Sequence, residues 1–287
     1  MEANASGMSD PGLVREVNED SFSVEDSLGL YVVADGMGGH LAGDVASAMA
    51  VELINKSFRR WTNGETPEDE LFGHPDESLS RQGNYVLSSI RLANKVIYEM
   101  ALEYDQYHGM GTTVVVLRVT PNRIITANVG DSRVYMVRDG RIERLSKDHT
   151  VVSEQVEMGA MNPEQAAKSP IKHILTRNLG SAEKVDAEIY ELEPLLGDRF
   201  ILCTDGLTEL LDDEEILQLT QKEDHPESLC RELVALALTR GAPDNTTVVC
   251  VFLSGHERGA GGPFTRIKSI LGDYFMGLRR IINKFKA

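Results

Sequence analysis

Short apolar runs recur along the first 255 residues and indicate β-strands. They are rich in Val, Ile and Thr and are bounded by Gly, Asp or Pro, as strands commonly are. Asp139-Gly140 is a tight-turn pair within one expected hairpin. Because hairpin-length links join several runs, the pattern predicts antiparallel sheets rather than a strictly alternating βαβ fold. The runs span residues 30–34, 112–119, 124–129, 134–137, 200–203 and 246–253.

Apolar residues spaced three and four apart predict helices between these runs. The clearest pattern extends from Val86 to Tyr104, a second extends from Leu229 to Leu238, and the Ala-rich segment 41–58 gives a third. Residues 62–80 differ, because they carry six acidic residues, no Lys or Arg, two prolines and two glycines. We expect a solvated surface loop there.

Charge divides the chain near residue 255. The whole chain has a net charge of −16, but residues 256–287 carry seven Lys or Arg and two acidic residues, a net charge of +5. The first 255 residues therefore carry −21. A Gly-rich stretch, GHERGAGGP, lies at the junction and is typical of a linker. We expect one domain at 1–255 and a linker with a basic tail at 256–287.

The tail carries apolar residues at helical spacing over 264–285, and basic residues occupy many of the other positions. This pattern is typical of a basic amphipathic helix that contacts a membrane surface or a partner. A helix that docks back on the acidic first part of the chain is an equally open alternative.

The composition of the chain limits where the protein is expected to be located in the cell and which kinds of partner it is expected to bind. The acidic excess argues against nonspecific nucleic-acid binding, which requires a basic surface. No apolar run approaches the roughly 18 residues of a membrane helix, and the start, MEANASGMSDPG, lacks the features of a signal peptide. Cys203, Cys230 and Cys250 show no metal-ligand spacing, so we expect buried thiols. These features favour a cytoplasmic protein and leave open a peripheral membrane contact through the tail.

Acidic residues lie at the ends of the predicted strands in four short motifs. They are Asn18-Glu19-Asp20, Asp35-Gly36, Asp205-Gly206 and Asp244-Asn245. Carboxylates that converge repel one another unless cations neutralise them, and oxygen-only ligands suit Mg²⁺ or Mn²⁺. One Asp-Gly pair alone is more often a turn than a ligand. Three such motifs joined to apolar runs favour a metal site.

Eight motifs, in order along residues 7–253, resemble the metal-dependent serine/threonine protein phosphatases of the type-2C (PPM) family in its compact bacterial form. They are VREVNEDSF, YVVADGMGGHLAGDVAS, GMGTTVVV, ANVGDSRVYMVRDG, LSKDHT, LTRNLG, FILCTDGLTELL and PDNTTVVCV. The resemblance implies an α+β fold, a four-layer α-β-β-α sandwich of two antiparallel sheets flanked by helices. It also implies a metal centre at one edge between the sheets and a variable flap at about residues 150–180.

The resemblance further implies two Mn²⁺ or Mg²⁺ ions. Asp35 matches the carboxylate that bridges the two ions, and Gly36 matches a ligand through its backbone carbonyl. Asp205 and Asp244 match the remaining protein ligands of the pair.

Four other positions match roles around the ions. Glu19 and Asp20 match the acidic pair that contacts the metal-bound waters, and Arg15 matches the arginine that binds the substrate phosphate. Asp131 matches a ligand of a weaker third metal site, although a role as a hairpin-turn aspartate is nearly as well supported by its position.

The implied activity is hydrolysis of phosphoserine and phosphothreonine in proteins by a hydroxide that bridges two metal ions. Bacterial relatives usually oppose serine/threonine kinases, so a bacterial kinase of this class and its targets are the expected partners. Two alternatives stay open: a non-catalytic phosphoprotein-binding pseudophosphatase, and a metallohydrolase of small phosphoesters.

The proton donor for the leaving group is not identified by the motifs. Met37 stands where eukaryotic relatives carry a histidine, and a thioether has no proton to donate. His40 is a candidate, although a solvent-facing position at the start of a helix is the simpler expectation. His149 is either structural or close to the site.

Overall fold

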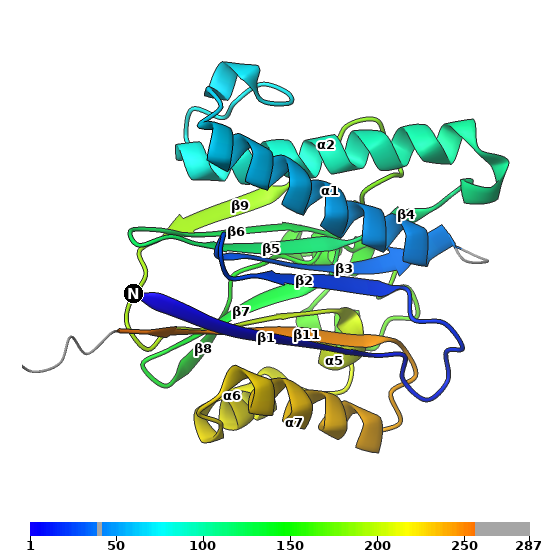
Figure 1. The fold of residues 1–287 in the computed structure, drawn as a ribbon. Helices are drawn as coiled ribbons and strands as arrows, with labels where there is room; N and C mark the ends of the chain where they lie inside the picture. Colours follow the sequence, from blue (N-terminus) through cyan, green and yellow to red (C-terminus); the bar gives the residue numbers. More distant parts are fainter. Residues whose placement is uncertain (39–41, 256–287) are drawn as a thin grey trace, which may run out of the picture. The chain divides into compact units, whose positions relative to one another are not determined.

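Two stacked β-sheets, each covered by helices on its outer face, make up the folded part of the chain (Figure 1). The computed structural model describes residues 1–38 and 42–255, and Ala3–Ser254 form one compact unit. Within the described residues, no helix combines the length and the apolar character needed to cross a bilayer.

The first sheet has the strand order β2-β3-β5-β6-β9, and a short strand β4 also pairs with β3. Its neighbouring strands are antiparallel, and Asp20 of β2 stands opposite Asp35 of β3 in the register. The strands are β2 (Asp20–Glu25), β3 (Leu30–Met37), β4 (Gly111–Thr112), β5 (Val114–Val119), β6 (Ile124–Val129) and β9 (Glu188–Leu192).

The second sheet has the strand order β1-β11-β10-β7-β8. β7 and β8 form the expected hairpin, with Asp139 at φ 50° and Gly140 at φ 73° in its turn, as a tight two-residue turn requires. The strands are β1 (Glu2–Asp10), β7 (Arg133–Arg138), β8 (Arg141–Arg144), β10 (Arg199–Cys203) and β11 (Thr246–Ser254).

Helices α1 (Ala42–Gly64) and α2 (Arg81–Glu103) cover the first sheet, and α5 (Asp205–Thr208), α6 (Asp213–Lys222) and α7 (Pro226–Thr239) cover the second (Figure 1). Segment 150–180 carries α3 (Val151–Glu157) and α4 (Pro163–Ala167). Two short 3₁₀ turns, η1 (Glu68–Glu70) and η2 (Asp105–Tyr107), flank α2. The expected four-layer α-β-β-α arrangement is confirmed.

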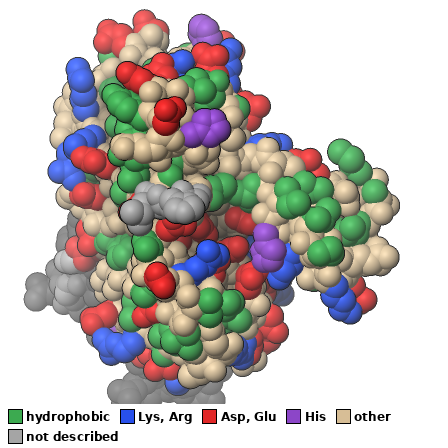
Figure 2. All heavy atoms as spheres, turned by 90° about the vertical axis from the view of Figure 1, so that its right-hand side faces the viewer, with side chains coloured by type: hydrophobic (Ala, Val, Ile, Leu, Met, Phe, Trp, Pro, Cys, Tyr) green, Lys and Arg blue, Asp and Glu red, His purple; other side chains and the backbone are tan. Residues whose placement is uncertain are grey.

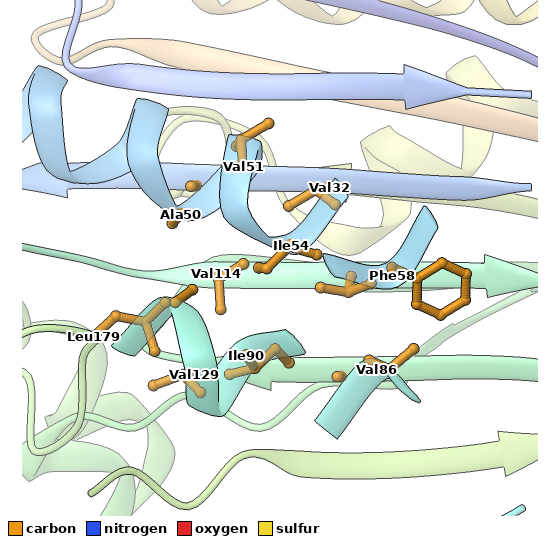
Figure 3. Packing of buried hydrophobic residues seen from close by; sticks show 14 of the residues in the cluster. Val32, Ala50, Val51, Ile54, Phe58, Val86, Ile90, Val114, Val129 and Leu179 are labelled. Atoms are coloured by element: carbon orange, nitrogen blue, oxygen red, sulfur yellow. The ribbon is translucent and has the colours of Figure 1, made fainter. Parts of the chain in front are cut away.

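Three apolar clusters hold these layers together. One lies between α1, α2 and the first sheet, where Ile54 and Ile90 meet Val114 (Figure 3). A second lies between α5–α7 and the second sheet, and a third lies between the two sheets. Their burial supplies the main driving force for stacking the layers in this order.

The six predicted strand runs and three predicted helices are confirmed, with one interruption at Thr113 between β4 and β5. The prediction of a solvated surface loop at 62–80 was wrong in part. α1 continues to Gly64, and Leu71 is buried in the cluster beneath α1 and α2.

The expected state of the cysteines is also confirmed, because Cys203, Cys230 and Cys250 are buried and free. His40 and the tail 264–285 lie outside the described residues.

Candidate active site

Acidic side chains from five separate parts of the chain meet at one end of the sandwich, around a cleft of about 950 Å³. Figure 2 looks onto this end, and acidic side chains gather in the hollow near its centre. The predicted site residues that line the cleft are Arg15, Glu19, Asp35, Gly36, Asp131, Asp205 and Asp244.

Asp35 is held near the end of β3 by Thr112, the last residue of β4, and by Thr113, which follows it. Its backbone N–H donates to Thr113 Oγ1 at 3.0 Å. Its carbonyl accepts from the Thr113 N–H at 2.9 Å and from the Thr112 hydroxyl at 2.8 Å. Since Asp20 stands opposite Asp35 in the register, the first sheet alone positions two carboxylates side by side.

A buried hydroxyl pair connects this strand end to Asp131. Thr113 Oγ1 lies 2.7 Å from Ser132 Oγ, and both side chains are buried. Asp131 immediately precedes Ser132 in the link between β6 and β7. The contact therefore brings Asp131 to the same cleft as Asp35.

Thr204 connects Asp20 to the end of β10 in the second sheet. Its hydroxyl donates to Asp20 Oδ2 at 3.0 Å and accepts from the Thr247 N–H at 3.0 Å. Asp205 follows as the first residue of α5. Asp20 is buried directly behind the cleft, and its other oxygen, Oδ1, has no hydrogen-bond partner among the described residues.

Asn245 holds the loop between β1 and β2 in place. Its Nδ2 donates to the carbonyls of Pro11 and Val17, each at 3.0 Å. Its Oδ1 accepts from the Glu19 N–H at 2.8 Å. One buried amide at the start of β11 thus sets the position of the loop that carries Arg15.

Arg15 forms an ion pair with Asp244 across the cleft mouth. Arg15 Nη2 donates to Asp244 Oδ2 at 2.7 Å, and this contact raises the pKa of Arg15. The arginine side chain remains 53% exposed. The pair fixes the orientation of the guanidinium while leaving it accessible to an anion that enters the cleft.

Two glycines let β3 and α1 approach Glu19 closely. A Cβ on Gly36 would overlap the carbonyl of Gly43, and a Cβ on Gly43 would lie 2.8 Å from Glu19 Cδ. The Gly36 N–H donates to the Glu19 carbonyl at 3.1 Å. The Glu19 carboxylate therefore lies at the N-terminal end of α1, where the helix dipole favours negative charge.

Burial, reinforced by neighbouring carboxylates, raises the pKa of the clustered aspartates. The pKa rises to about 7 for Asp20, about 8 for Asp131 and about 6 for Asp205, and the pKa of Asp35 is raised well above its usual value. Burial also raises the pKa of Glu19. Ionised together, these groups would repel one another strongly, and cations would relieve that repulsion.

The donor set fits divalent cations of the hard type. The acidic residues that line the cleft supply carboxylate oxygens, which Mg²⁺ and Mn²⁺ prefer. The unpartnered buried oxygen of Asp20 is a further sign, because buried polar atoms ordinarily have a partner.

Residues 14–239 match the family model described as protein phosphatase 2C. The chain belongs to the protein phosphatase 2C family. This confirms the resemblance carried by the eight motifs.

Two curated relatives are similar to this family member over most of the present chain. The serine/threonine protein phosphatase PstP of Mycobacterium tuberculosis is 36% identical over 255 residues, which cover 89% of this chain and 46% of PstP. The chain thus spans about half the length of that relative. The serine/threonine phosphatase stp of Listeria welshimeri is 33% identical over 245 residues, covering 84% of this chain and 92% of stp.

A solved structure of the family has the same fold. It is described as the catalytic domain of PstP in complex with two manganese ions. It aligns with a TM-score of 0.74 and 32% identity, and the match covers 88% of this chain and 99% of that chain.

Two further residues that sequence analysis singled out in this phosphatase 2C member are Met37 and His149. Met37 lines the cleft, and its sulfur accepts from Asn178 Nδ2 at 3.0 Å. His149 is buried away from the cleft, and its Nδ1 accepts from the Gly130 N–H at 3.1 Å. Of its two expected roles, the structure therefore supports the structural one.

Among the cleft residues that sequence reasoning missed are a histidine and a glutamate, His173 and Glu209. His173 Nδ1 lies 3.1 Å from Glu209 Oε1 and 3.9 Å from Asp205 Oδ2. These three residues offer potential ligand atoms that lie within 4.8 Å of one another. Lys172 Nζ lies 3.1 Å from the same Glu209 oxygen, so a lysine ammonium group already neutralises this carboxylate. His173 lies in the polar segment 150–180, where no periodic pattern identifies it.

Replacing Gly206 with Ala is expected to destabilise the fold by about 1–3 kcal/mol, as overpacked sites do. The new methyl group would overlap the carbonyl of Asn245, the residue that holds the Arg15 loop. Urea unfolding measures the change. Gly64→Ala is the control, because its Cβ would meet only Thr66 Oγ1 at 3.4 Å. Equal unfolding midpoints for the two variants would contradict the close approach at Gly206.

Proposed function

We propose that this protein is a metal-dependent phosphatase that hydrolyses phosphoserine and phosphothreonine in proteins. The observation that carries the proposal is the meeting of Arg15, in one cleft, with carboxylates supplied by five parts of the chain, those of Glu19, Asp35, Asp131, Asp205 and Asp244. The names of its relatives, serine/threonine phosphatases, support the substrate class.

Arg15 is assigned to bind the substrate phosphate. A planar guanidinium matches two phosphate oxygens at once, and such charged hydrogen bonds are strong. The ion pair with Asp244 at 2.7 Å holds the guanidinium against the acidic cluster, so a phosphoryl group bound there faces the carboxylates. Arg15 would also stabilise the negative charge on the transferring phosphoryl oxygens.

The carboxylates are assigned to hold two Mn²⁺ or Mg²⁺ ions. When bound, two such ions lower the pKa of a water shared between them and stabilise charge on the phosphoryl oxygens. Glu19 and Asp20 would orient the waters around the ions, and Asp131 would serve a third ion. The ligands assigned to the pair are Asp35, the Gly36 carbonyl, Asp205 and Asp244.

The proposal is tested with the full chain on p-nitrophenyl phosphate and a phosphothreonine peptide, each with EDTA, Mg²⁺ or Mn²⁺. Phosphate release from the peptide only with a divalent cation is the expected result. Activity on the small ester alone would contradict the protein substrate and favour a small-phosphoester hydrolase. A folded protein that is inactive with every metal but still binds the phosphopeptide would favour a pseudophosphatase.

Arg15→Ala is expected to lower kcat/KM by about 10²–10³-fold, the usual cost of removing one group that stabilises transition-state charge. Arg15→Lys keeps the charge but loses the planar fork, so it should recover only part of the activity. Steady-state kinetics on the phosphothreonine peptide measure both losses.

Arg59→Ala is the matched control for Arg15→Ala. Arg59 also pairs with a carboxylate, Glu25, at 2.6 Å, and its side chain is 51% exposed, but it lies outside the cleft. Its removal should leave kcat/KM unchanged. An equal loss in the two variants would contradict the role given to Arg15.

The remaining expectations extend this proposal. A bacterial serine/threonine kinase and its targets are the proposed partners, and a cytoplasmic location is the proposed site of action. We also propose that segment 150–180 acts as the variable flap and that 256–287 forms a separate tail. Contact of 264–285 with a membrane surface or a partner stays a prediction.

A further inference from the structure

Three exposed hydrophobic side chains flank Arg15 in the loop between β1 and β2. Leu13 is 67% exposed, Val14 is 68% exposed and Val17 is 41% exposed. Val17 also lines the cleft beside Arg15. Hydrophobic residues scattered singly on a surface are ordinary, but three within five residues at the mouth of a cleft form a small apolar surface.

The backbone of this loop is held at both ends. At one end, the Leu13 N–H donates to the Ala242 carbonyl at 2.9 Å. Gly12 has φ +77°, and a Cβ there would lie 2.6 Å from the same Ala242 oxygen. At the other end, Asn245 binds the Val17 carbonyl at 3.0 Å. The loop therefore presents its apolar side chains to solvent from a defined backbone conformation.

Segment 150–180 adds a hydrophobic side chain to the rim of the cleft. Ile174 is 51% exposed and lies between His173 and Leu175, which both line the cleft. Its backbone is also held, because the Val151 N–H donates to the Ile174 carbonyl at 2.9 Å. Figure 2 shows hydrophobic side chains on both sides of the hollow.

We propose that Leu13, Val14 and Ile174 form a docking surface for apolar residues next to the phosphorylated residue of a substrate polypeptide. This inference rests on the proposed function, because it needs the phosphate at Arg15. An extended chain advances roughly 3.3 Å per residue, so a phosphoresidue bound at Arg15 carries its neighbours over this rim. Covering the exposed apolar side chains there favours substrates with leucine-like neighbours.

The size of the surface favours a short peptide segment as its occupant. A standard protein–protein interface takes roughly 20–30 residues from each side, far more than this apolar surface offers. The surface is also continuous with the cleft through Val17 and Leu175. A phosphorylated, extended segment of a substrate protein fits both features.

The test compares two phosphothreonine heptapeptides, with Leu or with Gln on each side of the phosphothreonine, and p-nitrophenyl phosphate. The full chain, Leu13→Ser and Val14→Ser are assayed with Mn²⁺. Wild type should prefer the Leu peptide by about fivefold in kcat/KM, a typical effect of partly burying apolar side chains. Each variant should lose most of that preference.

Leu102→Ser is the matched control, since Leu102 is also 67% exposed but lies on α2, away from the cleft. It should keep the preference. Equal kcat/KM for the two peptides in wild type would overturn the inference. So would an equal loss of kcat/KM on all three substrates in Leu13→Ser and Val14→Ser, because such a loss would mean that the substitutions act through a displaced Arg15. If wild type releases phosphate from none of the substrates, the proposed function itself fails, which is a different outcome from active enzyme without preference.

Discussion

Asp35→Asn is expected to lower kcat by about 10³-fold or more while the protein stays folded, because it removes a charge on which the cation site depends. The backbone of residue 35 is held by Thr112 and Thr113, so the substitution leaves the strand end in place. The metal-free variant should also be more stable than metal-free wild type, since one of several repelling carboxylates is gone. Kinetics with Mn²⁺ and thermal unfolding in EDTA measure the two effects.

Asp69→Asn is the control for this substitution. Asp69 is exposed in η1 and lies outside the cleft, so its neutralisation should change neither kcat nor the stabilisation by Mn²⁺. In Asp35→Asn, the increase in Tm on adding Mn²⁺ should be largely lost. A variant that keeps both its activity and its full Mn²⁺-dependent increase would contradict the assignment of Asp35 to the cation site.

Strongly patterned elements could be predicted from the sequence, and weakly patterned edge strands could not. β11 is a continuous apolar run that is buried along nearly its whole length, and the pattern identified it. β1 has the sequence EANASGMSD and becomes a strand at the sheet edge next to β11. β9 is the edge strand of the other sheet, and its five residues are too few to show a clear alternation.

The ligand candidates of the site could be predicted, but the residues that position them could not. Asp35 and Asp205 adjoin apolar runs, so their place at a sheet end follows from the local pattern. Thr113, Thr204 and Asn245 act through contacts between segments far apart in the sequence. Such partners are determined only when the two sheets stack, so no local pattern reveals them.

Removing divalent cations is expected to make stability depend on pH between about 4 and 8. The pKa values of Asp205, Asp20 and Asp131 rise in the folded protein to about 6, 7 and 8, whereas aspartates in an unfolded chain titrate near 3.9. Between these values the folded state binds more protons than the unfolded state. Stability in EDTA therefore falls as pH rises through this window and levels off above it.

Asp205, Asp20 and Asp131 each contribute up to about 1.4 kcal/mol of lost stability per pH unit between the unfolded and the folded pKa, so the stability in EDTA should fall by several kcal/mol between pH 5 and pH 8. Saturating Mn²⁺ should offset much of this loss, because cations neutralise the ionised carboxylates. One ligand at 100 times its Kd adds about 2.7 kcal/mol, and the proposed site takes two ions. The difference in Tm between Mn²⁺ and EDTA should then widen from pH 5 to pH 8. In Asp20→Asn this Tm difference should increase less with pH than in wild type, whereas Asp69→Asn should behave like wild type. A difference that stays constant with pH would show that the clustered carboxylates titrate at ordinary values and do not act as a cation site.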